Sequence, residues 1–123
     1  MTNYLLVGFA CAASLIASSA FAFDMPIMTL ASNGEAYQGT IHAKMDRTST
    51  FELTGTNIDV TCTGATDKKG IGVLNCTNGR NLPLAIQGYG KLNGAYVETY
   101  GDVKVAIVWG KRAKADQLPA LLQ

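Results

Sequence analysis

The sequence predicts an all-β fold, a small antiparallel meander curled into a barrel or a strongly twisted sandwich. After Ala22, apolar and polar residues alternate with a period of two, and no long helical stripe appears. Turn signals divide this pattern into seven or eight short strands, with no stretch long enough for a parallel crossover. Glycines within the strands favour the barrel, because they allow sharp bending.

The first 22 residues have the composition of a secretory signal peptide. An apolar run from Tyr4 to Ile16 precedes the small-x-small site Ala20-Phe21-Ala22, so we predict cleavage after Ala22. The run is shorter than the ~20 residues that cross a bilayer, and no basic stop-transfer segment follows, so no transmembrane segment is expected after processing. The predicted parts are a signal peptide (1–22), a β-domain (23–110) and a basic C-terminal tail or short helix (111–123).

Two cysteines, Cys62 and Cys76, remain once the signal peptide has removed Cys11, and an even pair in an exported chain indicates a disulfide bond. They flank Lys68-Lys69-Gly70, which reads as a three-residue hairpin loop whose glycine supplies a positive φ. Counting outward from this loop places the cysteines opposite each other on a non-hydrogen-bonded pair, with Cα atoms roughly 4.5 Å apart. A four-residue loop would put the thiols on opposite faces. With the single His42 they make a poor zinc site, so neither a metal nor a cofactor is predicted.

The strands are expected in order along the chain, each ended by a polar or glycine-containing turn. Asn78-Gly79 and Asn93-Gly94 are signals of two-residue hairpin turns, and Pro83 indicates that its strand begins at an edge. The expected strands are Pro26–Ala31, Ala36–Met45, a short strand with Phe51 and Leu53, the stapled hairpin within Asn57–Thr77, a strand with Leu82, Leu84 and Ile86, the two strands around Asn93-Gly94, and Val103–Trp109. In the stapled hairpin, the apolar face is expected to hold Ile58, Val60, Cys62, Leu74 and Cys76.

Pairing across Asn93-Gly94 would gather Tyr89, Tyr96 and Tyr100 on one face. If Tyr100 pairs directly with Val103, these tyrosines share the face of the last strand's apolar residues and belong to the core. A loop one residue longer turns them outward and gives the cleaner apolar face, which is the arrangement we expect. Cross-strand packing accounts for the three tyrosines, and the sharper hypothesis makes them part of a partner surface.

Catalytic constellations are scarce in this sequence. His42 is the only histidine, and no nucleophile-elbow pattern surrounds a serine, so a Ser-His-Asp arrangement is not expected. Glu52 and Asp59 could form a carboxylate pair on neighbouring strands, although ordinary solvent-exposed positions explain both. No phosphate loop, dinucleotide fingerprint or metalloprotease helix is present in the sequence. We therefore predict that the protein is not an enzyme.

The charge pattern argues against nucleic acid as a partner. The formal net charge is +1, and the basic residues form no stripe of the kind that binds a phosphate backbone. The nearest approach is Lys111-Arg112-Ala113-Lys114, which reads as a solvated tail, with a weak contact to an anionic polymer or lipid as the alternative.

The run Cys62-Thr63-Gly64, followed by Gly70-Ile71-Gly72-Val73-Leu74-Asn75-Cys76 and Asn78-Gly79, resembles a motif of small exported bacterial β-proteins of unknown function. Their pattern is Cys-x-Gly, then Gly-x-Gly-x-Leu-x-Cys, then Asn/Asp-Gly. The resemblance is confined to this part of the chain. It implies bacterial export and a β-fold, and it brings no characterised active-site residues.

These observations predict a periplasmic or secreted, non-catalytic module that binds or supports a protein or another component of the bacterial envelope, through its surface or its barrel mouth. One alternative is a small inhibitor of a hydrolase such as a lysozyme or protease. Such an inhibitor needs a rigid exposed loop, and Lys68-Lys69 is the candidate. The other alternative, a small hydrolase using carboxylates, is the weakest of the three.

Overall fold

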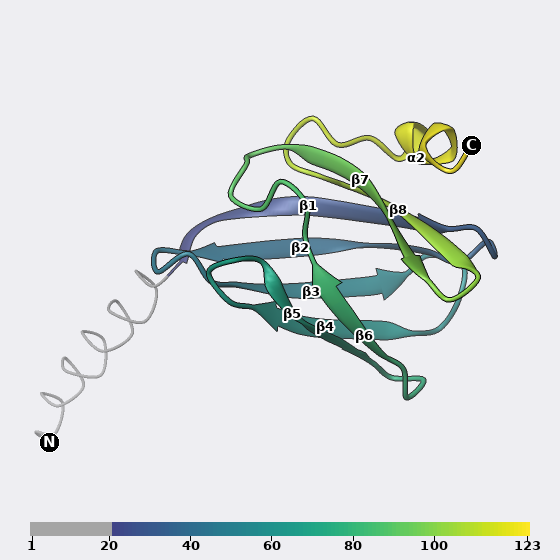
Figure 1. Ribbon diagram of the computed structural model, residues 1–123, viewed down its shortest axis with the longest axis horizontal. Helices are drawn as coiled ribbons and strands as arrows, with labels where there is room; N and C mark the ends of the chain where they lie inside the picture. The colour runs from purple at the N-terminus through teal and green to yellow at the C-terminus, as the bar shows by residue number, and fades with distance from the viewer. Residues whose placement is uncertain (1–20) are drawn as a thin grey trace, which may run out of the picture.

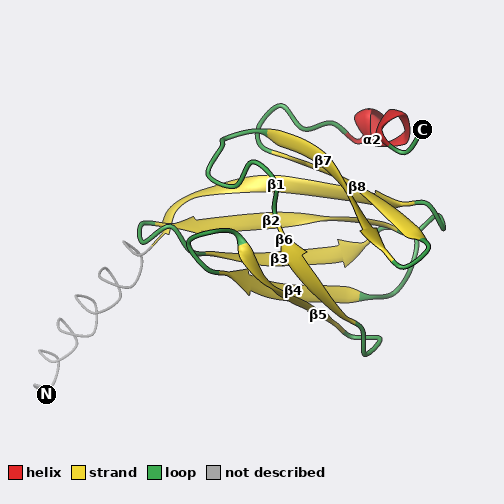
Figure 2. Ribbon diagram, in the orientation of Figure 1, coloured by secondary structure: helices red, strands yellow, loops and turns green. Residues whose placement is uncertain are grey.

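The structure is a computed structural model that describes residues 21–123, and it confirms the predicted antiparallel barrel. Eight strands form one nearly closed barrel, and a short helix packs outside it (Figures 1 and 2). The predicted signal peptide lies almost wholly outside the described residues. The elements are β1 (Phe21–Ala31), β2 (Ala36–Lys44), β3 (Ser49–Gly55), β4 (Thr61–Thr66), β5 (Ile71–Cys76), β6 (Asn81–Ala85), β7 (Gly94–Tyr100), β8 (Val103–Trp109), the 3-10 turn η1 (Ala115–Gln117) and α2 (Leu118–Leu121).

The strand order is β6-β5-β4-β3-β2-β1-β8-β7, and every pair is antiparallel. The one non-local pairing joins β1 to β8, with Ile27 opposite Trp109. The edge strands β6 and β7 are not paired in the sheet. They meet instead through the Tyr100 hydroxyl, which donates a hydrogen bond to the Pro83 carbonyl oxygen at 2.8 Å. The strand order therefore places Pro83 in the edge strand β6, as its missing N–H predicts.

Four hairpins of the meander share one three-residue loop design. In each, the residue before the loop donates its N–H to the carbonyl oxygen of the residue four positions later. The third loop residue donates its N–H to the carbonyl oxygen of the residue before the loop. That third position has a left-handed φ, and glycine occupies it in three of the loops: Gly34 (97°), Gly70 (82°) and Gly79 (90°). In the β2–β3 loop the same position holds Arg47, with φ 76°. The two-residue turn predicted at Asn78-Gly79 is therefore wrong by one residue.

The stapled hairpin has the predicted register. Cys62 lies opposite Cys76 and is bonded to it, with Cα atoms 4.0 Å apart. The next residue pair outward is hydrogen-bonded, because Thr77 donates its N–H to Thr61, so the cysteines occupy a non-hydrogen-bonded pair as predicted. Cys62 and Leu74 are buried on the inner face. The strand begins at Thr61, later than expected, because the N–H of Gly55 is bonded to Val60 in a tight β3–β4 turn.

The hairpin predicted at Asn93-Gly94 is not formed. Residues 86–93 are a loop that carries the chain from β6 to β7, and Gly88 and Gly90 have left-handed φ values of 78° and 96° within it. Gly94 does not act as a turn glycine. A Cβ at this position would lie 2.1 Å from the ring of Trp109, so the absent side chain makes room for the indole.

The expectation that the tyrosines face outward is wrong. β7 pairs with β8 so that Tyr100 lies directly opposite Val103, which turns Tyr96 and Tyr100 toward the barrel interior. Tyr96 is 7% exposed and makes an edge-to-face contact with Trp109 at 6.0 Å. Burial raises the pKa of Tyr96 well above its usual range. Tyr89 lies apart from them, in the β6–β7 loop.

The C-terminal segment ends in a 3-10 turn and a short helix that packs on the barrel. Leu118 is 5% exposed and packs against the outer side of β8 at Ala106 and Val108. Pro119 is the second residue of α2 and does not break it, because the first turn of a helix does not need its N–H. Among the described residues, no helix has the length and apolar character needed to cross a membrane.

Candidate functional site

A cavity of about 440 Å³ lies at the end of the barrel where β1 begins and β8 ends. We call this the basic end. Its apolar lining comes from inward-facing residues of β1, β2 and β8 and from the loop that follows β6. The lining residues are Phe23, Met25, Ile41, Ala43, Lys44, Arg47, Thr48, Lys68, Ile86, Tyr89, Gly90, Lys91 and Trp109.

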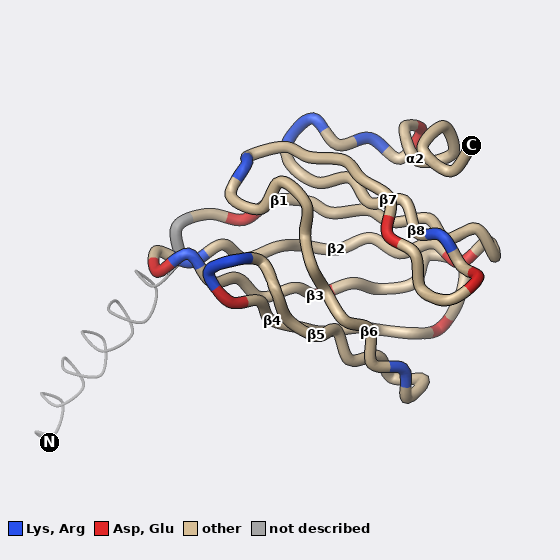
Figure 3. Tube along the Cα trace, in the orientation of Figure 1, with Lys and Arg blue, Asp and Glu red and all other residues tan. Residues whose placement is uncertain are grey.

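The mouth of this cavity is basic. Lys44, Arg47, Lys68 and Lys91 line it, and no aspartate or glutamate does. These are four of the ten lysines and arginines of the chain, whose formal net charge is only +1. Lys44 is the last residue of β2, and the other three come from the β2–β3, β4–β5 and β6–β7 loops, which Figure 3 shows toward the left end of the barrel.

Two carboxylates near the mouth are already engaged by neighbouring donors. Asp46 Oδ1 accepts hydrogen bonds from the Thr48 hydroxyl at 2.6 Å and the Thr48 N–H at 3.0 Å, and these bonds lower the pKa of Asp46, with a smaller contribution from Lys44 and Lys68. Asp67 Oδ1 accepts the N–H groups of Ile71 and Lys69, which lower the pKa of Asp67. Both carboxylates shape loops and lie outside the cavity lining.

Tyr89 ties the β6–β7 loop to this end of the barrel. Its hydroxyl donates to the carbonyl oxygen of Arg47 at 2.7 Å and lies within hydrogen-bond distance of the hydroxyls of Ser49 (2.9 Å) and Thr66 (3.1 Å). Its ring covers Gly70, where a Cβ would lie 2.6 Å from the ring. The loop is thereby attached to two hairpins, β2–β3 and β4–β5, and it forms one wall of the cavity.

Trp109 forms the floor beside Met25 and Ile41, and all three side chains are less than a tenth exposed. Its indole N–H donates to the carbonyl oxygen of Lys91 at 3.2 Å, which fixes the ring under the β6–β7 loop. Trp109 is the only tryptophan of the chain, so tryptophan fluorescence reports on the surroundings of this one indole.

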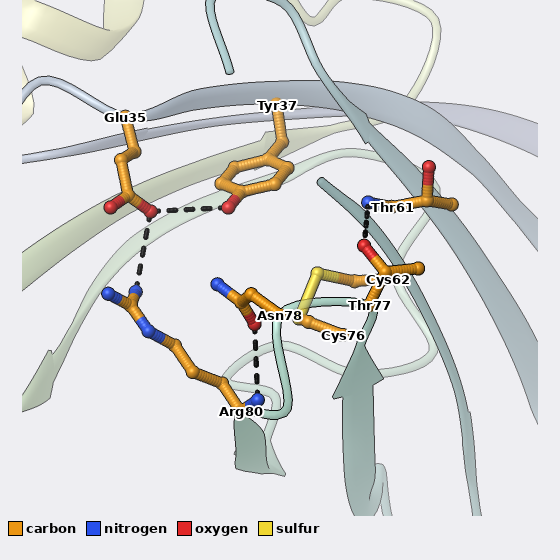
Figure 4. The surroundings of a disulfide bond; sticks show 8 residues. All are labelled: Glu35, Tyr37, Thr61, Cys62, Cys76, Thr77, Asn78 and Arg80. Atoms are coloured by element: carbon orange, nitrogen blue, oxygen red, sulfur yellow. Dashed lines mark hydrogen bonds and ion pairs between the residues drawn. A yellow bond between two sulfur atoms is a disulfide. The ribbon is translucent and has the colours of Figure 1, made fainter. Parts of the chain in front are cut away.

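A second cavity, of about 290 Å³, lies at the opposite end of the barrel. The Cys62–Cys76 disulfide lines it, and Figure 4 shows Glu35, Tyr37 and Arg80 grouped beside that bond. Glu35 accepts a hydrogen bond from the Tyr37 hydroxyl at 3.2 Å and an ion pair from Arg80 at 3.4 Å. The mouth of this second cavity therefore holds an ion pair, whereas the lining of the basic end has cations and no carboxylate. A layer of inward residues that line neither cavity separates the two: Ile27, Gly39, Phe51 and Tyr96.

His42 lies on the outer face of β2 between two carboxylates. Its Nδ1 is 2.8 Å from Asp24 and its Nε2 is 3.3 Å from Glu52. The hydrogen bond to Asp24, and secondarily that to Glu52, raises the pKa of His42. Glu52 therefore faces His42, whereas Asp59 lies in the β3–β4 turn, and the carboxylate pair considered from the sequence gains no support. In the part of the chain that the structure describes, no group of three or more metal-ligating side chains occurs.

Lys68 and Lys69 are exposed at the tip of the stapled hairpin, as expected, and only Lys68 lines the cavity. Sequence reasoning missed the cavity and three of its four mouth cations. The signal that could have found them is Arg47, a bulky residue at the hairpin position that glycine occupies elsewhere in this chain.

The described geometry defines an antiparallel barrel with a basic-mouthed internal cavity. Comparison with protein-family models, with curated proteins and with solved structures finds no match to this chain. The resemblance to small exported β-proteins therefore stays a prediction.

Proposed function

We propose that the protein is an exported, non-catalytic binding module that takes a small, partly apolar ligand into the basic end of its barrel. The observation that carries this proposal is the cavity of about 440 Å³, which lies within the range of ~300–1,000 Å³ typical of ligand sites. Eight-stranded barrels are just wide enough to be filled by side chains or to hold one small ligand. Here the side chains fill the middle of the barrel and leave its basic end open.

Two features support a role outside the cytoplasm. The first 22 residues have the composition of a signal peptide, and the disulfide is of a kind that persists in oxidising compartments. Cleavage after Ala22 would leave the pairing of Phe23 with Ala43 intact, so the mature chain would keep the wall of the cavity. A periplasmic or secreted location in bacteria, with an envelope component as partner, is part of this proposal.

A fluorescent probe tests the proposal directly. N-phenyl-1-naphthylamine is neutral and apolar, and it accepts excitation energy from tryptophan. We expect saturable binding of one dye per chain with energy transfer from Trp109. The Ala43→Phe substitution fills the cavity and should weaken dye binding at least tenfold, whereas Ala65→Phe, the same change on the outer face of β4, should leave it within twofold.

Wild-type protein that shows no saturable dye binding would refute the proposal, whatever the variants do. Equal weakening by the two substitutions would also refute it, because the dye would then not be in the barrel. Thermal unfolding of each variant shows that it is folded, and the energy transfer in the wild-type protein gives an answer that needs no variant.

Inhibition of a hydrolase is the second candidate, and one observation favours it. The Lys68-Lys69 tip is exposed and braced, since the Asp67 carboxylate binds two N–H groups of the same loop and the disulfide closes the hairpin behind it. Assays of lysozyme and protease activity with and without the mature protein test this role. Inhibition that is lost in Lys69→Ala, a residue outside the cavity lining, would favour it over ligand uptake.

A further inference from the structure

We propose that the ligand of the basic end is a single-chain anionic amphiphile, an alkyl chain that ends in a carboxylate or phosphate head. This inference rests on the proposed function and adds the class of ligand. Its chain would lie against the apolar floor and its head would lie among the mouth cations.

The distribution of charge selects an anion. Four cationic side chains line the mouth and no acidic side chain does. Asp46 and Asp67 remain ionised nearby, outside the lining, so the mouth cations outnumber these two carboxylates. Three of the four, Arg47, Lys68 and Lys91, are exposed at their positions, so a charged head can remain in contact with water while it is neutralised. Clefts lined by one sign of charge concentrate ligands of the opposite sign.

The interior selects an alkyl chain. Below the cations, the lining is made by Met25, Ile41, Ile86 and Trp109, without a charged group. The polar atoms nearby are already engaged: the Trp109 N–H donates to Lys91 and the Tyr89 hydroxyl to Arg47. A ligand rich in hydroxyl or amide groups would find few partners there, and unpaired polar groups are costly to bury. The volume, toward the small end for ligand sites, suits one chain rather than two.

Arg47 provides an independent observation. Three hairpins of the chain have glycine at the left-handed loop position, and the β2–β3 hairpin has Arg47 there with φ 76°. A residue with a side chain is strained in this conformation, and such strain is retained where the site needs it. A structural role alone would be served better by glycine. The retained guanidinium lines the cavity mouth, as an anion site requires.

The test is displacement of bound N-phenyl-1-naphthylamine by amphiphiles that share one twelve-carbon chain, below their micelle concentrations. Dodecanoate and dodecyl phosphate carry the proposed heads, and dodecyltrimethylammonium is the cationic control. We expect at least one of the anions to displace the dye at a concentration at least tenfold lower than the cation does. The better anion identifies the head group. Its advantage should shrink as salt is added, because the Debye length falls.

Two sets of variants locate the head group. Arg47→Gly restores the glycine of the other loops, so it should fold at least as well as wild type while weakening anion binding severalfold. Lys68→Glu with Lys91→Glu should weaken it at least tenfold. The control, Lys104→Glu with Lys114→Glu, makes the same change in net charge at exposed residues outside the cavity lining and should have less than a twofold effect.

Two results would overturn the inference while leaving the proposed function in place. One is equal displacement by the anions and the cation. The other is anion binding that responds equally to the mouth variants and the control pair. In both cases the dye still binds in the barrel. Failure of the dye itself to bind would instead remove the proposed function, so the two failures are distinguishable.

Discussion

Reduction of the Cys62–Cys76 bond should destabilise the barrel by an amount that follows from the length of the closed loop. The two residues are 14 apart, so the bond closes a loop of 15 residues. The chain-entropy account gives about 3 kcal/mol for a loop of this size. Both cysteines pack in or against the core cluster. Reduction breaks the bond but removes no side-chain atoms from the core, so it leaves no cavity there.

The assay is thermal unfolding of the mature protein with and without a reductant, with thiol counting before and after. For a domain of this size, 1 kcal/mol corresponds to about 4–8 °C in Tm, so reduction should lower Tm by about 12–24 °C. A double Cys62→Ala/Cys76→Ala variant should unfold near the reduced protein, with a small further loss from the truncated side chains. Free thiols in the untreated protein, or a shift below about 4 °C on reduction, would refute this reasoning.

Three further predictions concern single side chains. Tyr89→Phe should lower the free energy of unfolding by about 1–2 kcal/mol, because its hydroxyl bonds join the β6–β7 loop to the barrel, and denaturant titration measures this. Tyr96→Ser should lower it by about 3–5 kcal/mol, as expected for a buried aromatic side chain, whereas a small loss would restore the exposed-surface interpretation. The pKa of His42, followed by NMR titration, should exceed its ordinary value of about 6.5 and fall in Asp24→Asn. Because the folded-state pKa of His42 is raised, the contribution of His42 to stability is fully present below the unfolded-state pKa and disappears as the pH rises through the folded-state pKa. A loss of stability on acidification through this range that disappears in Asp24→Asn would contradict this prediction.

Local signals predicted the meander well. In the stapled hairpin, Gly70 and the two cysteines are consistent with only one register, and the structure has that register. The same loop design recurs around Gly34 and Gly79. At Gly79 the sequence predicts a two-residue loop, because Asn-Gly is the usual signal for one.

The failures come from contacts between residues far apart in the chain. Gly94 resembles a turn glycine in sequence, yet it is needed because the Trp109 ring occupies the place of its side chain. No local pattern reports that contact. The contact depends on the β7–β8 register, in which Tyr100 lies opposite Val103. The apolar pattern of the sequence is also compatible with a register that differs by one residue.

The candidate site was beyond sequence reasoning for the same reason. Its mouth cations lie at the end of β2 and on three loops, which converge only when the sheet curls and β1 pairs with β8. In sequence, Lys44 and Lys91 look like ordinary solvated residues. Only Lys68 stands out in the sequence, and it does so as a candidate contact residue of an inhibitor.

The central claim is that the basic end of the barrel holds the chain of an anionic amphiphile above Trp109. The most direct measurement is of intermolecular nuclear Overhauser effects between the methylene protons of dodecanoate or dodecyl phosphate, whichever binds more tightly, and the labelled mature protein. We predict contacts with the Trp109 indole and the Met25 methyl group, and none with Tyr100, which lines the opposite cavity. Contacts confined to Tyr100 or to the outer face of the sheet, or no contacts at a saturating ligand concentration, would contradict the claim.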